Sequence, residues 1–254
     1  MKELGLDRWI LKMCEKMNFI NPTKIQQLAI PEILKGKNVI AHSETGSGKT
    51  ACFSFPILQN LAKDPFSVYA LVLTPNRELA FQIAEQVAVF GSSINTRCVT
   101  VVGGMDMIKQ AMEIEKLPHF IIATPGRLLD LINRDEKTRE LLGNLKYLVL
   151  DEVDRLLDDS IIDDLKEILA ILPKERQCIF TTATLNKKVE DNLEFLLGGQ
   201  KEVVKVEVNK KAKTVEGLTQ QYLFIPDQVK DNYFIHLLNE YRDKSCIVFV
   251  SNCM

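Results

Sequence analysis

Two adjacent carboxylates, Asp151 and Glu152, follow directly on the apolar and aromatic run Tyr147–Leu150. Such a run is typical of a buried strand, and burying a carboxylate without a partner costs several kcal/mol. A cation or a reactive water beside the pair would offset that cost, which would make it a catalytic or metal-binding pair. Taken alone, the two acids fit better as a cluster at the start of a helix before Arg155, so their assignment depends on what lies opposite.

The segment Ser43–Thr50, SETGSGKT, is the candidate for that opposite partner. It follows a β-rich run and precedes an apolar helical stretch, and it is close to the P-loop pattern, whose glycines let backbone N–H groups surround phosphate oxygens. Ser43 stands where the pattern has Gly. The alternative, a Gly/Ser turn with a capping residue, is disfavoured by the strand–loop–helix context. The predicted nucleotide-binding residues here are Ser43, Glu44, Thr45, Gly46, Ser47, Gly48, Lys49 and Thr50.

The P-loop segment and the acid pair together predict ATP hydrolysis with Mg²⁺. Lys49 is expected to reach the β- and γ-phosphates, and the Thr50 hydroxyl to coordinate Mg²⁺. Asp151 is expected to hold the same ion through water, and Glu152 to polarise the water that attacks the γ-phosphate. The predicted catalytic residues are therefore Lys49, Asp151 and Glu152, and the predicted metal-binding residues are Thr50 and Asp151.

Short β-rich runs alternate along the chain with stretches of helical spacing. The runs are Val39–Ser43, Tyr69–Thr74, Cys98–Val102, Phe120–Thr124, Tyr147–Asp151 and Cys178–Thr182. Helical spacing is clearest between residues 78 and 90 and between residues 161 and 172. Alternation with near-continuously apolar strands predicts an α/β fold with a parallel sheet covered by helices on both faces. Right-handed crossovers then place the carboxyl ends of the strands at one edge, where ligands bind.

The composition is that of an ordinary globular protein: 254 residues, 46% hydrophobic, 26% charged and a net charge of −2. No global positive field indicates nucleic acid, so such binding would need local contacts. The six cysteines are scattered, without a C-x-x-C pair or a nearby His, which disfavours disulfides and zinc and favours buried free thiols. No apolar run approaches the length of a membrane helix, so we expect a soluble, intracellular protein without membrane contact.

The sequence changes character after residue 208. Residues 1–208 are expected to form one nucleotide-binding domain, and residues 209–217, NKKAKTVEG, a linker. Residues 218–254 are expected to begin a second α/β domain, with a helix over residues 227–241 and a strand over residues 246–252. We therefore expect the chain to be the N-terminal part of a longer protein.

Seven short motifs along the chain resemble, in order, those of the DEAD-box ATP-dependent RNA helicases. The strings are FINPTKIQ (Phe19–Gln26), SETGSGKT, TPNRELA (Thr74–Ala80), VGG (Val102–Gly104), TPGR (Thr124–Arg127), DEVD (Asp151–Asp154) and TAT (Thr182–Thr184). The resemblance spans nearly the whole chain. It implies a RecA-like fold for the P-loop domain and the start of a second RecA-like domain.

Residues 17–27 resemble the family's adenine-reading Q motif. The resemblance implies that Phe19 stacks on the base and that Gln26 hydrogen-bonds its edge, supported by Thr23. A structural alternative stays open, because Thr23 and Gln26 also form the sequence of a capping box at the start of a helix. The family has a further aromatic residue at the position that Met1 occupies here.

TPNRELA, VGG and TPGR resemble the family's RNA-contacting motifs. The implied RNA-binding residues are Pro75, Arg77, Gly103, Gly104, Thr124, Pro125, Gly126 and Arg127. Asn76 stands where Thr is usual. Ordinary turn chemistry explains the Pro, Gly and Thr residues equally well, whereas a turn does not require the two arginines. Contacts to phosphate and 2′-OH groups carry no sequence code, so the expected partner is RNA, single-stranded or duplex, bound independently of sequence.

TAT and DEVD together imply a link between ATP state and RNA handling. The coupling residues implied by the resemblance are Asp154, Thr182 and Thr184, with a hydrogen bond expected between Thr182 and Asp154.

The implied function is that of the ATP-binding domain of an RNA helicase, which binds ATP, ADP, Mg²⁺ and RNA but hydrolyses ATP poorly without the second domain. GGMDM and IPDQVKDNYFIHLL most resemble the branch that acts in small-subunit ribosome assembly, which implies rRNA processing in the nucleus or nucleolus, with the cytoplasm as the alternative. A monomer with a protein cofactor is expected. Two other hypotheses stay open: a P-loop ATPase of another class, such as a DNA translocase, and a non-catalytic, nucleotide-gated RNA clamp.

Overall fold

The computed structural model describes residues 1–65, 67–200, 202–208, 219 and 221–250. The chain divides into two units, Met1–Asn209 and Lys210–Met254, each of which is described by itself. The predicted linker, residues 209–217, lies outside the described residues.

The first unit is built on a seven-stranded sheet in which every described pair of strands is parallel. The strands are β1 (Val39–His42), β2 (Ala70–Leu73), β3 (Cys98–Val101), β4 (Phe120–Ala123), β5 (Tyr147–Leu150), β6 (Gln177–Thr182) and β7 (Val204–Glu207). Their order across the sheet is β3-β4-β2-β5-β6-β1-β7. The predicted α/β fold with a parallel sheet is confirmed, and each predicted β-rich run contains a strand.

Strand β7 was not predicted. It lies at the edge of the sheet, paired with β1 alone, and only Val206 of its residues is buried. Because charged Lys205 and Glu207 alternate with the valines, the run lacks the continuous apolar character used to recognise the other strands.

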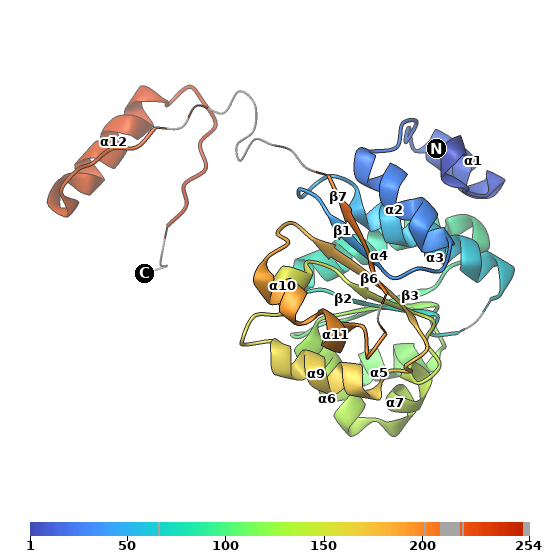
Figure 1. The fold of residues 1–254 in the computed structure, drawn as a ribbon. Coiled ribbons are helices and arrows are strands. Elements are labelled where there is room, and N and C mark those ends of the chain that lie inside the picture. The colour runs from blue at the N-terminus through green and yellow to red at the C-terminus, as the bar shows by residue number, and fades with distance from the viewer. Residues whose placement is uncertain (66, 201, 209–218, 220, 251–254) are drawn as a thin grey trace. The chain divides into compact units, whose positions relative to one another are not determined.

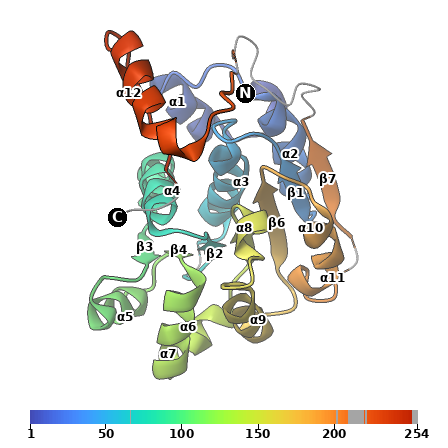
Figure 2. The ribbon, with the colours of Figure 1, turned by 90° about the vertical axis from the view of Figure 1, so that its left-hand side faces the viewer.

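Helices cover both faces of the sheet (Figures 1 and 2). One face carries α1 (Arg8–Lys16), α2 (Lys24–Leu34), α3 (Lys49–Lys63) and α4 (Arg77–Phe90). The other carries α5 (Met107–Glu115), α6 (Pro125–Arg134), α7 (Glu136–Leu142), α8 (Val153–Leu156), α9 (Ile162–Ile171), α10 (Lys187–Asp191) and α11 (Leu193–Leu196). Alternate residues of each strand enter one of the two apolar cores: Val149 belongs to the first, and Leu148 and Leu150 to the second.

The helices that follow β1, β2 and β4 begin with residues suited to a helix start. Gly48 precedes α3 in the left-handed conformation, with φ of 87°. The Asn76 side chain accepts a hydrogen bond of 2.8 Å from the Leu79 N–H at the start of α4. Pro125 is the first residue of α6, where its missing N–H and fixed φ are favourable. The carboxyl ends of these parallel strands therefore lead into helix N-termini along one edge of the sheet.

Asn38 fixes the register of β1 from the opposite edge. Its Oδ1 accepts a hydrogen bond of 2.7 Å from the Cys178 N–H, and its Nδ2 donates to Gln200 Oε1 at 2.8 Å and to the Glu202 carbonyl at 3.1 Å. A shift of register would leave the buried Asn38 amide and the Cys178 N–H unpaired. These bonds therefore hold β1, the strand before the P-loop, in a fixed register relative to β6 and β7.

The second unit contains one α-helix, α12 (Lys230–Glu240), preceded by a 3₁₀ turn, Asp227–Val229, within its described residues. This confirms the predicted helix over residues 227–241. The predicted strand over residues 246–252 is wrong for its described part, because residues 246–250 have no regular structure. The described residues of this unit offer no second strand for pairing, and an isolated strand leaves its backbone groups without partners.

None of the helices in the described ranges has both the length and the apolar character needed to cross a membrane.

Candidate active site

The loop between β1 and α3 has the backbone shape of a phosphate-binding loop. Gly46 and Gly48 both have positive φ, 78° and 87°, which glycine adopts without strain. A Cβ at Gly48 would also lie 2.4 Å from Gln26 Nε2, so a side chain here would displace the Gln26 amide as well as strain the backbone. The Ser43 and Ser47 hydroxyls share a hydrogen bond of 2.6 Å across the loop. Ser43 therefore adds a loop contact that Gly, the usual residue at this position, could not make.

Lys49 lies at the start of α3 with its ammonium group inside the loop. Its Nζ donates to the carbonyls of Ser43 at 2.6 Å and Glu44 at 3.0 Å. Burial lowers the pKa of Lys49, and the negative charges of Asp151, Glu152 and Asp154 oppose that shift. The catalytic residues predicted from two distant segments are thus electrostatically coupled in the structure.

Asp151 is a buried carboxylate at the end of β5, with only 5% of its surface exposed. Its N–H donates to the Leu73 carbonyl at 2.9 Å, and its Oδ1 accepts a hydrogen bond from the Thr181 hydroxyl. Burial raises the pKa of Asp151, and the hydrogen bond from Thr181 acts in the opposite direction. An ionised group at this position is unfavourable for the fold unless a cation compensates it.

Glu152 is held in a left-handed backbone conformation, with φ and ψ both 53°, directly before α8. For a residue with a side chain this conformation costs about 1–2 kcal/mol, and such strain concentrates at functional sites. Its N–H donates to Thr181 Oγ1 at 3.3 Å, and its carboxylate forms an ion pair of 3.2 Å with Arg155. The two predicted acids therefore project from a strained turn at the carboxyl edge of the sheet.

Sequence reasoning missed Thr181, which contacts both acids. It is fully buried on β6, and the pairing of Leu150 with Phe180 continues so that Thr181 stands beside Asp151. The signal in the sequence was a polar residue inside the apolar run before TAT, but only the strand register identifies its partner.

The predicted hydrogen bond between Thr182 and Asp154 is wrong. Asp154 accepts instead from the Thr184 hydroxyl. The Thr182 hydroxyl donates to the Thr184 carbonyl at 2.8 Å and accepts from its N–H at 3.1 Å. Because Thr182 ends β6 and its hydroxyl closes the following turn, Thr184 is the residue whose hydroxyl reaches Asp154.

Gln26 forms the predicted capping box and also contacts the P-loop. Its Oε1 accepts a hydrogen bond of 3.0 Å from the Thr23 N–H, while its Nε2 donates to the Gly48 carbonyl at 3.2 Å. The side chain is 2% exposed. An amide has two donor hydrogens and two acceptor lone pairs, so one N–H and one lone pair of Gln26 remain after these bonds. The capping interpretation is thereby confirmed. The remaining N–H and lone pair are not used by the cap, so the cap is compatible with base recognition.

A cavity of about 670 Å³ joins the base-side and phosphate-side residues. The predicted residues that line it are Phe19, Gln26, Thr45, Gly46, Gly48, Lys49, Thr50, Asp151 and Glu152. Phe19 lies edge-to-face on Phe90, with ring centroids 6.2 Å apart. Sequence reasoning missed the remaining lining residues, which are Met17, Ala51 and the α4 residues Leu79, Gln82, Glu85, Gln86, Val89 and Phe90.

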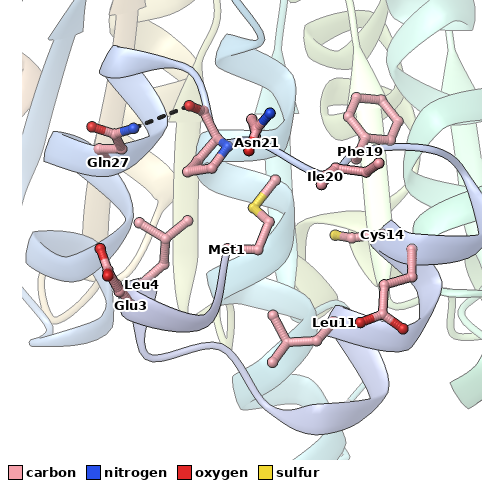
Figure 3. A pocket seen from close by; sticks show the side chains of 11 residues that line it. Met1, Glu3, Leu4, Leu11, Cys14, Phe19, Ile20, Asn21 and Gln27 are labelled. Carbon is pink, nitrogen blue, oxygen red and sulfur yellow. Dashed lines mark hydrogen bonds between the residues drawn. The ribbon is translucent and has the colours of Figure 1, made fainter.

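A second hollow, of about 580 Å³, also has Phe19 in its lining (Figure 3). Met1, Leu4, Leu11 and Cys14 line it together with Phe19. The structure therefore places Met1, where the family has an aromatic residue, in this hollow and not among the lining residues of the nucleotide-sized cavity.

The residues predicted to contact RNA lie on the loops and helix starts after β2, β3 and β4. The Arg127 Nε donates to Gln110 Oε1 at 2.9 Å, and its Nη2 donates to the Met105 carbonyl. Gln110 in turn donates to the Val102 carbonyl at 3.0 Å. Arg127 is therefore a tether for the loop that follows β3.

Arg77 differs from Arg127. It packs against Gly104, where a Cβ would stand 2.4 Å from its Nη1. Within the described ranges its guanidinium forms no hydrogen bond or ion pair, and the residue is exposed. The Arg77 guanidinium and the N–H groups at the N-terminus of α4 beside it can donate hydrogen bonds to a phosphate oxygen.

The described side chains fit a magnesium ion that is bound together with a nucleotide. In the described part of the chain, no cluster of three or more His, Cys, Asp or Glu side chains is placed to hold a metal by itself. One buried carboxylate, Asp151, and one hydroxyl, Thr50, line the cavity beside Lys49. Mg²⁺ at nucleotide sites takes one or two protein ligands of this kind and completes its shell with phosphate oxygens and water.

Comparison with known proteins identifies the family. A family model described as DEAD/DEAH box helicase matches residues 23–192. The ATP-dependent RNA helicase DDX47 of Drosophila melanogaster is 47% identical over 252 residues, which cover 99% of this chain and 49% of that protein. The ATP-dependent rRNA helicase rrp3 of Schizosaccharomyces pombe is 45% identical over 249 residues, covering 98% of this chain and 52% of that protein. The chain spans about half the length of the curated relatives it matches.

Solved structures agree with this assignment. The DEAD-box helicase Mss116 bound to single-stranded RNA and UDP-BeF is similar with a TM-score of 0.74 and 33% identity, over 83% of this chain and 45% of that chain. A DEAD box protein from Methanococcus jannaschii gives a TM-score of 0.74 and 31% identity, over 94% of this chain and 62% of that chain. The predicted resemblance is confirmed, and the chain belongs to the DEAD/DEAH box helicase family.

Proposed function

We propose that this chain is the ATP-binding part of an ATP-dependent RNA helicase, an RNA-stimulated ATPase that remodels or unwinds RNA. One observation carries the proposal: a single cavity joins Phe19 and Gln26 to Lys49 and to the acid pair Asp151 and Glu152. Base-side groups, a phosphate-side ammonium and two carboxylates are the parts that a nucleoside triphosphatase needs.

In the proposed complex, phosphate oxygens replace the Ser43 and Glu44 carbonyls as acceptors for the Lys49 ammonium. Backbone N–H groups at the start of α3 point to the same phosphates, because the first N–H groups of a helix have no partner within it. The exchange substitutes a charged acceptor for neutral carbonyls, so the half-buried ammonium is better compensated in the complex.

Thr50 and Asp151 would hold Mg²⁺, which neutralises charge on the β- and γ-phosphates when it is bound. Glu152 would orient the attacking water and accept its proton. Its ion pair with Arg155 and the hydrogen bond from its N–H to Thr181 fix the position of the Glu152 carboxylate before the nucleotide binds. General-base catalysis needs such a group within hydrogen-bond reach of the water.

RNA is proposed to bind along the loops after β2, β3 and β4, through Arg77, the Gly103–Gly104 backbone and the start of α6, residues 124–127. Phosphate and sugar contacts of this kind predict binding that is independent of sequence. The structures of Mss116 with single-stranded RNA support this side of the proposal, and the description of the yeast relative rrp3 as an rRNA helicase supports a role in rRNA processing in the nucleus or nucleolus.

The first test removes the ammonium. Lys49→Ala is expected to weaken Mg²⁺–ATP binding by about ten- to hundredfold, because hydrogen bonds to charged groups contribute about 1.5–3 kcal/mol. Removing the ammonium also removes the charge that opposes the pKa shift of Asp151, so a modest fall in the thermal midpoint without nucleotide is expected as well. Calorimetric titration of the 254-residue chain measures the affinity, and Lys63→Ala, at the other end of α3, is the matched control. Unchanged ATP affinity in Lys49→Ala would contradict the placement of the phosphates.

The second test concerns nucleotide choice. Gln26→Ala is expected to lower stability by about 0.5–2 kcal/mol through the lost cap. If the remaining N–H and lone pair of Gln26 read adenine, the wild type should prefer ATP over GTP roughly five- to hundredfold, because a mismatched hydrogen-bond pair costs ~1–3 kcal/mol. Gln26→Ala should then also lose this preference. Binding of both nucleotides and thermal stability are measured, with the neighbouring Gln27→Ala as control. A preserved ATP/GTP ratio in a less stable Gln26→Ala would leave only the cap.

The third test separates the two arginines at the RNA edge. Arg77→Gln is expected to weaken single-stranded RNA binding without changing the thermal midpoint, and to reduce the slope of log K against log salt by about 0.7, the value for one phosphate contact. Arg127→Gln should weaken binding and also lower the midpoint, because it releases the loop after β3. Arg139→Gln on α7 is the control. An unchanged salt slope in Arg77→Gln would remove Arg77 from the RNA contacts.

A further inference from the structure

We propose that Thr181 is a positioning residue for the magnesium–nucleotide site, acting through the metal-binding carboxylate of Asp151 and the backbone of Glu152. This inference rests on the proposed function and extends it to a residue outside the family's motif strings in this sequence.

Thr181 lies in the sheet between the acid pair after β5 and the P-loop after β1. It lies on β6, which pairs with β5 on one side and with β1 on the other. Its register partner on β1 is Ala41, two residues before the P-loop begins at Ser43. Ala41 and Ile179, two residues before Thr181, both belong to the core under α1–α4, so Thr181 faces the side on which α3 starts.

The hydrogen bonds of Thr181 fix the orientation of its hydroxyl. The Glu152 N–H is a donor, so at 3.3 Å it uses a lone pair of Thr181 Oγ1. The hydroxyl hydrogen is then free for Asp151 Oδ1, and an ionised carboxylate can only accept. The bond to Asp151 is buried and the bond from Glu152 is partly buried, because Thr181 is fully buried and Asp151 nearly so.

This arrangement orients the carboxylate that is proposed to serve the metal. Asp151 Oδ1 accepts from Thr181, and Asp151 lines the cavity together with Lys49 and Thr50. The same hydroxyl anchors the N–H of Glu152 in its left-handed conformation, so one side chain sets the direction of both acids. A partner that orients a ligating carboxylate contributes to metal affinity even though it does not touch the metal.

Thr181→Val keeps the shape of the side chain and removes the hydroxyl. We expect the Mg²⁺ concentration for half-maximal ATP binding to rise about tenfold, the size of a lost hydrogen bond to a charged group. ATP binding without Mg²⁺ should not change, because the P-loop backbone and Lys49 are untouched. Thr181→Ser restores the hydroxyl and should return the Mg²⁺ requirement to within about twofold of wild type, as expected when the same bond is remade.

Thr138→Val is the matched control. Thr138 is also fully buried and donates its hydroxyl to an aspartate, Asp135, but at the start of α7 and away from the cavity. Its loss should lower the thermal midpoint without changing the Mg²⁺ requirement. If Thr181→Val does not fold, Thr181→Ala, which removes the hydroxyl together with the γ-methyl group, is measured in its place.

Each result has one meaning. Wild-type protein that does not bind Mg²⁺–ATP overturns the proposed function itself. Wild-type binding with an unchanged Mg²⁺ requirement in Thr181→Val, or a shift that Thr181→Ser does not reverse, overturns the positioning role alone. A tenfold shift that Ser reverses and that Thr138→Val does not reproduce supports it.

Discussion

A buried carboxylate coupled to a half-buried ammonium across the carboxyl edge of a parallel sheet is the interaction on which the rest of this structure depends. Asp151 and Lys49 are both placed where burial disfavours their charged forms, and each charge opposes the shift of the other. Neither position improves the stability of the fold on its own. The proposed ligand, which carries both anionic phosphates and a cation, would account for the arrangement, and binding it would recover the stability given up in the free protein.

The sheet and its two apolar cores hold these charges in place. Parallel strands covered on both faces have little freedom to shift register, and Asn38 closes the opposite edge with bonds to β6 and to the segment before β7. Gln26 joins the start of α2 to Gly48, so a hydrogen bond connects the base side of the cavity to its phosphate side. Thr181 connects the acid turn after β5 to the neighbouring strand β6. Each connection is a buried or partly buried hydrogen bond, where losing one partner is costly.

The sequence was sufficient for those features that depend on local pattern. Continuous apolar runs identified the inner strands. The P-loop segment and the acid pair predicted a site, and Lys49, Thr50, Asp151 and Glu152 do line one cavity, because parallel topology brings strand ends together. Other features depend on long-range geometry. In the edge strand β7, valines alternate with charged residues, so no continuous apolar run marks it. The contact of Thr181 with the acid pair follows only from the register of β5 and β6. That Thr184, and not Thr182, donates to Asp154 follows only from the turn after β6. Gln82, Glu85 and Gln86 have the sequence of a solvated helix face, and only the fold turns them toward the cavity.

The most direct measurement is the thermal midpoint of Asp151→Asn beside wild type, with and without Mg²⁺–ATP. Because burial raises the pKa of Asp151, the folded protein holds this proton more tightly than the unfolded chain does, and the wild-type protein loses stability as pH rises from the unfolded-state pKa through the folded-state pKa. At neutral pH we expect the variant, which keeps the acceptor for Thr181 but carries no charge, to melt higher than wild type without nucleotide. The difference should shrink as the pH is lowered, and the rise in midpoint on adding Mg²⁺–ATP should be largely lost in the variant. A variant that melts lower than wild type without nucleotide and keeps the full rise with Mg²⁺–ATP would contradict the account.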